Sequence, residues 1–387
     1  MMQLLQVFKS QGYSITVASA ASKSEFSADL ALLGYDTANI QMNDASFDRF
    51  IKTLDPGTVL FDRFLTEEQF GWRVAENCPN ALRMLDTEDL HSLRHVREQC
   101  FKKDIPFSTE AWLADDNTKR EIASIYRCDL SLIISSYELE LLTEVVKIDK
   151  RLLLLLPFMV PEITSETMWT PFEDRKDFVF IGGGKHAPNL DAITTLKTII
   201  WPLLRRQVPD ARLHVYGAYL PQQMLDMNNP KERFLVRGRA ESVDAVMQSA
   251  KVCLAPLHFG AGIKGKLVAA MQNGTPSVTT TVGAEGMHGI LDWNGYIEND
   301  HTAFVAAASR LYTTKQAWEK AQEQGKTLIN TLYTQRSLQH VFLEKLMQIR
   351  NELVKHRQQN FTGALLQHQS MMATKFMGKW IEEKNRG

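Results

Sequence analysis

Short apolar runs alternate with amphipathic stretches along most of the chain, which is typical of parallel β-sheets flanked by helices. In the first half, the apolar runs predict strands over residues 14–18, 59–61, 82–85, 130–134 and 152–156. The stretches between them have helical periodicity, most clearly over residues 67–77, 118–127 and 138–146. We therefore expect residues 1–160 to form one Rossmann-like α/β domain.

A second series of strands and helices begins at Asp177. Its predicted strands cover residues 178–181, 213–216, 234–236, 252–256 and 277–280, and its helices 189–206, 242–250 and 263–272. The preceding residues 161–176 break the rhythm with Pro161, Pro171 and scattered charges, so we interpret them as a linker. We expect a second doubly wound, Rossmann-like domain over residues 177–335 and helices over residues 336–387.

The opening of the chain departs from this pattern. A doubly wound domain normally begins with a strand, whereas Leu4, Leu5 and Phe8 have helical spacing and the first predicted strand starts only at Ser14. Two explanations stay open: the fold has lost its first strand, or the natural chain starts upstream of Met1. We favour the second.

Composition and charge exclude several classes of function. The 387 residues include 44 Lys and Arg against 45 Asp and Glu, so the net charge is −1 and no global basic field attracts nucleic acid. The four cysteines are far apart without histidines at zinc spacing, which predicts reduced thiols of a cytosolic protein and no metal site. The longest apolar run, residues 152–160, is far shorter than the roughly 20 residues of a spanning helix, and the first residues lack a signal-peptide pattern.

The stretch from residue 252 to 286 carries the strongest signal for chemistry. A buried strand is followed by a loop with Gly260 and Gly262, and a helix then begins with Ile263, Lys264 and Lys266. Glycines let backbone amides approach a ligand closely, and the unpaired N–H groups of a helix start favour an anion. Two lysines in the first turn are unfavourable unless an anion offsets them. The spacing fits phosphate binding or, equally, a tight connection with solvated lysines.

Two more glycine turns follow predicted strands. Gly182-Gly183-Gly184 comes after residues 178–181, and Gly283-Ala284-Glu285-Gly286 after residues 277–280. Three glycines at the end of a strand suit the close passage of a ligand or of the facing domain. They suit equally well a flexible turn before the helix that Pro188 introduces, and the sequence leaves both readings open.

Taken together, these motifs resemble the nucleotide-sugar half of glycosyltransferase family 4. The resemblance rests on runs in the order of the family: Phe180-Ile181-Gly182 with Pro188-Asn189-Leu190-Asp191-Ala192, Pro209-Asp210-Ala211-Arg212-Leu213 with Tyr216-Gly217, Phe259-Gly260-Ala261-Gly262-Ile263-Lys264-Gly265-Lys266, and Gly274-Thr275-Pro276 with Gly283-Ala284-Glu285-Gly286. It covers about residues 177–333. The first half resembles the family more weakly, through the His-containing segment 86–94 and the turn Ser135-Ser136-Tyr137-Glu138.

The resemblance implies the GT-B fold, in which two Rossmann-like domains face a cleft, with the donor nucleotide in the second domain and the acceptor on the side of the first. It implies retaining transfer of a sugar from a nucleotide-diphosphate sugar to a glycan or lipid-linked acceptor in polysaccharide assembly. Neither a metal nor a cofactor is implied. The last long helix, near residues 338–354, would return to the first domain. Such an enzyme is expected in the cytoplasm, at the inner face of the membrane where the acceptor is lipid-linked.

The family motifs also imply roles for particular residues. Lys264 and the amides of Gly262 and Ile263 would stabilise the charge that grows on the leaving diphosphate. His91 would contact the donor sugar, or else it is a polar surface residue. The turns and loop beside the donor would contribute Gly182, Gly183, Gly184, Gly260, Lys266, Gly283, Ala284 and Glu285.

Two departures from the family favour an alternative function. Many members carry two glutamates eight positions apart that read sugar or ribose hydroxyls, and alignment on Gly274 places Ala261 and Ala269 there. Loss of a charged hydrogen bond without a substitute weakens binding by roughly 1.5–3 kcal/mol, and Glu285 is out of register to replace it. The alternative is a weak or inactive binding protein that acts as a partner in a glycan-assembly complex.

The end of the chain has an apolar helical stripe flanked by lysines. Leu365, Met372, Phe376 and Trp380 share this stripe, and the neighbouring cations are Lys375, Lys379 and Lys384. Such a helix could rest on an anionic membrane, or it could dock on the first domain or fray. We favour the second explanation, and we expect the fold to survive deletion from Leu365 onward.

Overall fold

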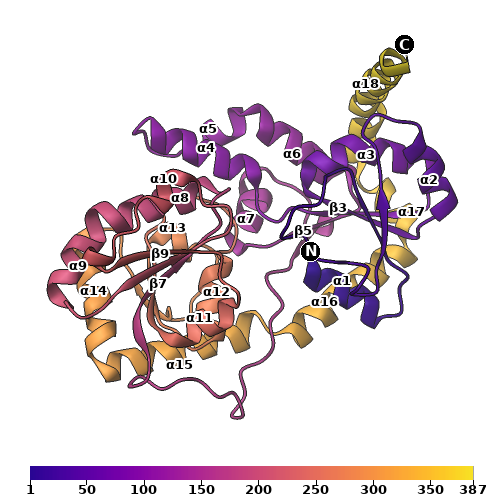
Figure 1. The fold of residues 1–387 in the computed structure, drawn as a ribbon. Helices are drawn as coiled ribbons and strands as arrows, with labels where there is room; N and C mark the ends of the chain where they lie inside the picture. The colour runs from indigo at the N-terminus through magenta and orange to yellow at the C-terminus, as the bar shows by residue number, and fades with distance from the viewer. Residues whose placement is uncertain (387) are drawn as a thin grey trace.

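The computed structural model, which describes residues 1–386, contains two larger parallel sheets, one in each half of the chain (Figure 1). The first sheet has the order β3-β4-β5-β6, formed by β3 (Thr58–Asp62), β4 (Leu82–Asp86), β5 (Leu130–Ile133) and β6 (Leu153–Leu155). The predicted strands thus lie within two residues of the observed ones. Strands β4 and β5 are almost wholly buried, as expected inside a parallel sheet covered on both faces.

Helices connect and cover the first sheet. They are α2 (Ser46–Leu54), α3 (Arg63–Asn77), α4 (His91–Lys102), α5 (Thr109–Ala114), α6 (Asp116–Arg127) and α7 (Ser136–Glu140), which continues as a π-helical turn over Leu141–Val145, and a 3₁₀ turn covers Lys150–Leu152. The helices predicted at residues 67–77, 118–127 and 138–146 correspond to α3, α6 and α7. The sheet and these helices place the carboxyl ends of β3, β4 and β5 on the side of the second domain.

The chain opens with helix α1 (Met2–Ser10), as the spacing of its apolar residues predicted. Strand β1 (Thr16–Ser19) follows and pairs with β2 (Asp36–Asn39), and within residues 1–386 this pair stays apart from the first sheet. The strand expected near residues 14–18 is therefore present but does not extend the main sheet. Its sequence explains this, because β1 and β2 contain few apolar side chains and are mostly exposed.

The second sheet has the order β12-β11-β10-β7-β8-β9 and is parallel throughout. Its strands are β7 (Lys176–Ile181), β8 (Leu213–Tyr216), β9 (Phe234–Gly238), β10 (Ala250–Ala255), β11 (Ser277–Thr279) and β12 (Gly295–Ile297). The order reverses between β7 and β10, and a crevice at such a switch point is where open α/β sheets bind ligands. Strand β12 was not predicted, since its three residues form no apolar run.

Helices surround the second sheet on both faces. They are α8 (Ala187–Thr195) with a π-helical turn over Leu196–Ile200, α9 (Trp201–Gln207), α10 (Gln222–Leu225), α11 (Val243–Ser249), α12 (Gly265–Gln272), α13 (Thr281–Ala284), α14 (His301–Thr313) and α15 (Lys315–Leu332), and a 3₁₀ turn covers Pro230–Glu232. The helix expected over residues 189–206 is thus one continuous helical region made of three parts.

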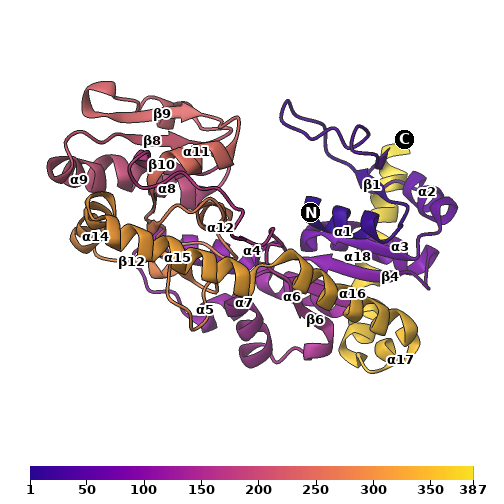
Figure 2. The same ribbon diagram turned by 90° about the horizontal axis from the view of Figure 1, so that it is seen from below.

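The chain then crosses back to the first domain. Helix α16 (Gln335–Asn351) runs on from α15 and reaches beneath the first sheet (Figure 2), where Phe342 and Leu346 share a buried cluster with Leu82 and Leu130. The returning helix implied by the resemblance is therefore present. No helix in the described part of the chain is both long and apolar enough to span a membrane.

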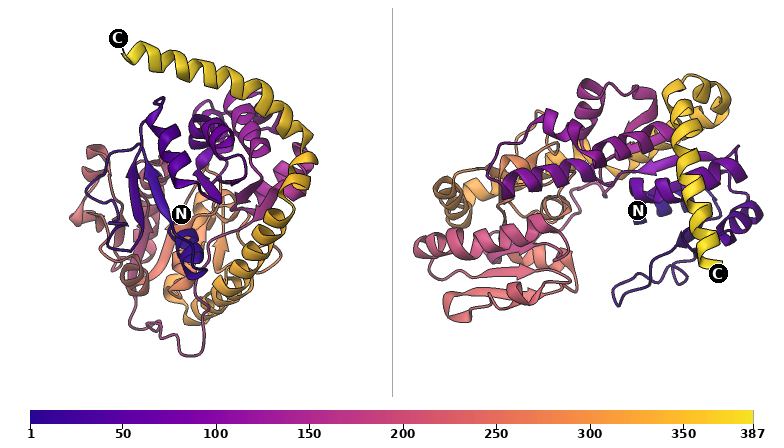
Figure 3. Two further views of the ribbon diagram at one scale, coloured as in Figure 1. Left: turned by 90° about the vertical axis from the view of Figure 1, so that its right-hand side faces the viewer. Right: turned by 90° about the horizontal axis from the view of Figure 1, so that it is seen from above.

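The last two helices, α17 (Leu353–Gln358) and α18 (Phe361–Arg386), end on the first domain (Figure 3). Helix α18 packs along α3 and α6, where Lys375 pairs with Glu76 at 2.8 Å and Glu382 pairs with the buried Arg73. The docked helix is thus confirmed. The expectation that the fold survives deletion from Leu365 onward stays a prediction, and because α18 supplies a partner to the buried Arg73, the deletion should cost stability.

Candidate active site

The segments that follow β4 and β5 meet those that follow β10 and β11 along a line of close contact that we call the seam. A Cβ atom added to Gly262 would lie 2.7 Å from the Cβ of Asp89, and one added to Gly286 would lie 2.1 Å from Ser135 Oγ. Both glycines also have left-handed backbones, with φ of +63° and +70°. These two glycines are therefore required for the second domain to reach the first.

The backbone of Gly262 already has a partner across the seam. Its N–H donates to Glu138 Oε1 at 2.8 Å, and the N–H of Leu90 donates to the same oxygen at 2.9 Å. The sequence led us to expect that the Gly262 amide faces a diphosphate, whereas here it faces a buried carboxyl group. Glu138 is wholly buried.

Lys264 lies at the start of helix α12, in the loop that follows β10. Its Nζ donates to the carbonyl of Gly262 at 2.7 Å, and the side chain is almost completely buried. Burial lowers the pKa of Lys264 to about 8, although Glu285 and Glu138 act in the opposite direction. The predicted anion-binding lysine is thus a desolvated cation between the two domains, next to the half-buried Ile263.

Lys266 joins the same loop to the first glycine turn. Its Nζ donates to Asn189 Oδ1 at 2.5 Å, and Asn189 Nδ2 donates to the carbonyl of Gly183 at 3.0 Å. Burial lowers the pKa of Lys266 to about 8 as well. A Cβ on Gly182 would lie 2.6 Å from Asn189 Cγ, and one on Gly184 would lie 2.2 Å from a backbone oxygen. The turn is therefore tightly packed at Gly182 and Gly184, whereas a Cβ on Gly183 would meet open space.

His91 begins helix α4 at the carboxyl end of β4. Its Nε2 lies 3.1 Å from Asp89 Oδ1. The pKa of the imidazole is lowered, first by partial burial; Asp89 raises it and Arg94 lowers it. The pKa of His186, in the second domain, is also lowered, first by burial and then by Arg94. Arg94 therefore acts electrostatically on a histidine of each domain, His91 and His186.

A buried carboxylate fixes the start of helix α4. Glu121 accepts hydrogen bonds from the N–H groups of His91 and Ser92, both at 3.0 Å, and from Ser92 Oγ at 2.7 Å. Burial raises the pKa of Glu121 to about 7, against these hydrogen bonds. Glu121 is thus the N-terminal cap that orients His91.

The third glycine turn is bound to the first domain by an ion pair. Arg97 donates to both oxygens of Glu285, at 2.6 and 2.9 Å, and to the carbonyl of Gly260 at 2.9 Å. Gly283 and Ala284 are buried in the turn behind Glu285. Glu285 therefore holds the domains together, and its carboxylate is not free to replace the one missing at Ala269.

Several residues of this region were not singled out from the sequence. Arg63, Arg94 and His186 lie near the predicted residues. Arg63 and Glu88 have left-handed φ values of +68° and +57° after β3 and β4. Strained backbones of this kind gather at functional sites. Arg63 directly follows a strand, and Arg94 lies in the first turn of the helix after the next strand. These positions are the sequence signal that could have identified both arginines.

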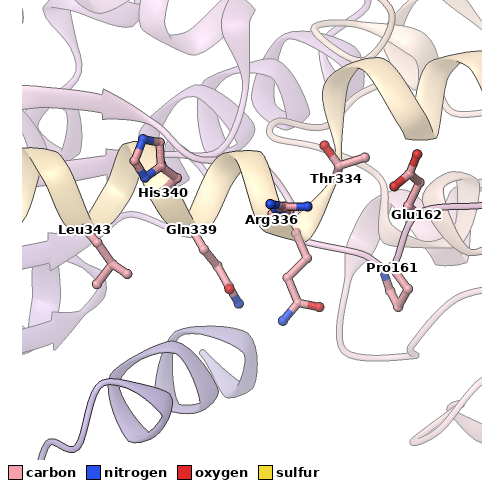
Figure 4. A pocket seen from close by; sticks show the side chains of 8 residues that line it. Pro161, Glu162, Thr334, Arg336, Gln339, His340 and Leu343 are labelled. Atoms are coloured by element: carbon pink, nitrogen blue, oxygen red, sulfur yellow. The ribbon is translucent and has the colours of Figure 1, made fainter.

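Two cavities lie near the domain boundary. One, of about 280 Å³, opens at the rim of the seam and is lined by both domains, including Tyr137, Glu285 and His288. The other, of about 460 Å³, lies where the linker meets α16 and is lined by polar groups such as Glu162 and Arg336 (Figure 4). Within residues 1–386, no three His, Cys, Asp or Glu side chains are grouped so as to hold a metal.

Comparison with known families agrees with this geometry. Residues 175–314 match the family model described as glycosyl transferases group 1. This segment is similar to a group 1 glycosyltransferase domain. It contains Lys264, Lys266 and the three glycine turns, and the match confirms the resemblance stated from the sequence for this part of the chain.

Solved structures confirm the fold over most of the chain. TarM of S. aureus, solved with UDP, has 12% identity and a TM-score of 0.59 over 79% of this chain, which spans only 58% of TarM. Sucrose-phosphate synthase from Thermosynechococcus elongatus has 15% identity and a TM-score of 0.65, covering 90% of this chain and 92% of its own. Anabaena HepE with UDP and glucose has 10% identity and a TM-score of 0.64, covering 90% and 95%.

All three are GT-B glycosyltransferases, so the two Rossmann-like domains have the GT-B arrangement. The sequence has no match among curated proteins.

Proposed function

We propose that this glycosyltransferase moves a sugar, with retention of configuration and without a metal, from a nucleotide-diphosphate donor to a glycan or lipid-linked acceptor. The observation that carries the proposal is two lysines beside glycine turns, the buried Lys264 and the partly buried Lys266, whose pKa values are lowered to about 8. Both donate to neutral oxygens, those of Gly262 and Asn189. Cations that donate only to neutral oxygens are strongly stabilised when an anion enters the site.

The chemistry follows from where charge develops during transfer. As the bond from the anomeric carbon to the diphosphate breaks, negative charge grows on the leaving diphosphate, and Lys264 and Lys266 stabilise it. The start of helix α12, where Gly265 is exposed, adds its positive dipole end. The mostly uncharged His91 supplies a polar contact for the sugar from the first domain.

The solved relatives suggest which donor to test first. The structures of TarM and HepE were both determined with UDP, and the TarM complex also holds α-GlcNAc-glycerol. We therefore propose a uridine diphosphate sugar as the donor and a glycan as the acceptor, within polysaccharide assembly in the cytoplasm.

We also propose that the molecule contacts the inner face of the membrane through α18. Although this helix is docked, Phe376 and Trp380 remain 59% and 60% exposed on its outer side, with Lys379 exposed between them. Aromatic side chains with neighbouring lysines suit an anionic lipid surface. Vesicles with anionic lipid should bind the wild type and bind Phe376→Glu/Trp380→Glu much less, and equal binding by both would rule out this contact.

A second function is favoured by specific observations in the site. Ala261 and Ala269 lack the carboxylates of the family, and the Gly262 amide is occupied by Glu138. These features fit a protein that binds a nucleotide sugar without turnover and serves as a partner in a glycan-assembly complex.

Turnover separates the two functions. The purified chain is incubated with uridine diphosphate sugars, with and without a chelator, and released UDP and the anomer of the product are followed by NMR. Retained configuration and chelator-insensitive turnover support the proposal. Saturable binding without any hydrolysis or transfer supports the binding protein, and an inverted product contradicts the mechanism.

A further inference from the structure

One carboxyl oxygen joins the two domains at the centre of the seam. Glu138 Oε1 accepts from the N–H of Leu90 at 2.9 Å and from the N–H of Gly262 at 2.8 Å. Leu90 directly precedes His91, which begins α4, and Gly262 lies two residues before Lys264. A single atom therefore ties the helix of His91 to the loop of Lys264.

The other oxygen of this carboxyl group is in an unusual environment. Glu138 Oε2 is buried without a hydrogen-bond partner. Burial, and next the nearby Asp89, raise the pKa of Glu138 to about 8, while Lys264 acts in the opposite direction. A proton on Oε2 makes the carboxyl group neutral, which avoids a second buried negative charge beside Asp89, so the contacts fit a neutral acid.

We propose that Glu138 is a positioning residue that, as a neutral acid, holds the Lys264 loop against the His91 helix through one doubly accepting oxygen. The contact itself is independent of the activity, whereas its catalytic consequence rests on the proposed function. Arg97 and Ser136 also bond across the seam, to Glu285 and to the carbonyl of Gly286. Glu138 differs from both because a single side-chain oxygen accepts from the backbone on both sides of the seam, next to His91 and in the loop of Lys264.

Because Glu138 is proposed to be a neutral acid, its substitution by Gln, Leu or Asp should affect the contact in different ways. Glu138→Gln keeps Oε1 as the acceptor and puts an N–H₂ group where the proton would be, so it should preserve the contact. Glu138→Leu removes the acceptor and leaves two buried N–H groups unpaired. Glu138→Asp keeps the acid but shortens the side chain, so it should not reach both amides. Glu140, exposed on the same helix, provides matched controls in Glu140→Gln and Glu140→Leu.

Hydrogen exchange measures the contact without any assumption about activity. We expect the Gly262 amide to exchange about tenfold faster or more in Glu138→Leu, within about threefold of wild type in Glu138→Gln, and unchanged in both Glu140 variants. If Glu138→Leu does not fold, Glu138→Asp should show the same loss of protection. Exchange in Glu138→Gln as fast as in Glu138→Leu, or wild-type protection in Glu138→Leu or Glu138→Asp, overturns the proposal.

Kinetics then test the positioning role. With a donor that is turned over, Glu138→Leu should lower kcat about tenfold or more with a smaller change in the donor KM, and Glu138→Gln should restore kcat. An unchanged kcat in Glu138→Leu overturns the role. If no donor is turned over by the wild type, the proposed function fails while the exchange result stands by itself.

Discussion

Lys264 and Lys266 are the two residues on which the chemistry of the seam depends. Lys264 is almost completely buried and Lys266 is partly buried, and each donates to a neutral oxygen rather than to a carboxylate. Their lowered pKa values mean that both are mostly charged at pH 7 and mostly neutral at pH 9. A bound diphosphate would give these two lysines negatively charged acceptors, whereas the acceptors that the protein supplies are neutral.

The affinity for a nucleotide diphosphate should therefore fall as the pH rises. Above a pKa of about 8 each lysine loses the proton that attracts the anion, so Kd should increase about tenfold per lysine between pH 7 and pH 9. Calorimetric titration at the two pH values measures this, and Lys266→Met should show a shallower dependence. A Kd that is constant across this range contradicts the assignment.

Removal of one lysine should affect transfer directly. Lys264→Met keeps the volume of the side chain but not the charge, and we expect kcat/KM to fall about tenfold or more through lost stabilisation of the leaving diphosphate. Lys326→Met, on α15 and far along the chain from the seam, is the control. Unchanged kinetics in a folded Lys264→Met variant would remove this residue from the mechanism.

The glycine turns and lysines could be predicted from the sequence because each motif is local. The pairings of Glu138 with Gly262 and of Arg97 with Glu285 could not, since they join residues 124 and 188 positions apart. The sequence consequently showed which atoms can bind an anion, but not that one of the amides is already bound to a carboxyl group.

At the scale of elements, helix α4 is the part of the first domain that brings His91 and Arg97 to the seam. Its first turn is fixed by Glu121 on α6, through two N–H groups and the hydroxyl of Ser92. Trp112 of α5 also donates to that hydroxyl, at 2.9 Å. Three helices thus share one buried capping arrangement.

Loss of this cap should destabilise the protein. Glu121→Ala leaves buried donors unpaired, and we expect the free energy of unfolding to fall by about 2–4 kcal/mol. Urea denaturation measures it. Glu98→Ala, which removes an i,i+4 pair with Lys102 on the surface of α4, should cost less than about 0.5 kcal/mol. Equal effects of the two substitutions would contradict the capping role.

Helix α18 should also contribute to stability. A chain that ends at Ala364 leaves the buried Arg73 without Glu382, although Asp48 remains at 2.6 Å. We expect the free energy of unfolding to fall by about 2–4 kcal/mol, which a lower urea midpoint would report. A truncated chain as stable as the full one would show that the docking of α18 is energetically neutral.

Most elements were predictable because buried strands and amphipathic helices have distinct periods. Strand β12 and the separate β1–β2 pair were harder, since three-residue or polar strands depend on the neighbours they pair with rather than on their own side chains.

At the scale of the whole molecule, the seam couples the two domains. Arg97 is held between the rings of Phe107 and Tyr137, at 5.0 and 5.1 Å, while it pairs with Glu285. The first domain thus contacts the turn after β11 as well as the loop after β10. Contacts of this kind fix the position of Lys264 and Lys266 relative to the first domain.

A double-mutant cycle on Arg97→Ala and Glu285→Ala should show strong coupling. The pair is bidentate and largely buried, so we expect a coupling energy of about 1–3 kcal/mol in the free energy of unfolding. The surface pair of Lys119 and Asp116 is the control and should give less than about 0.5 kcal/mol. Additive effects at Arg97 and Glu285 would mean that the ion pair does not join the domains.

The most direct test of the account is a calorimetric titration of nucleoside diphosphates and their sugars into the wild type and into Lys266→Met at pH 7. The account predicts that at least one uridine diphosphate compound binds the wild type at a single site and binds the variant about tenfold more weakly. Failure of every compound to bind the wild type, or equal affinity for both proteins, would contradict it.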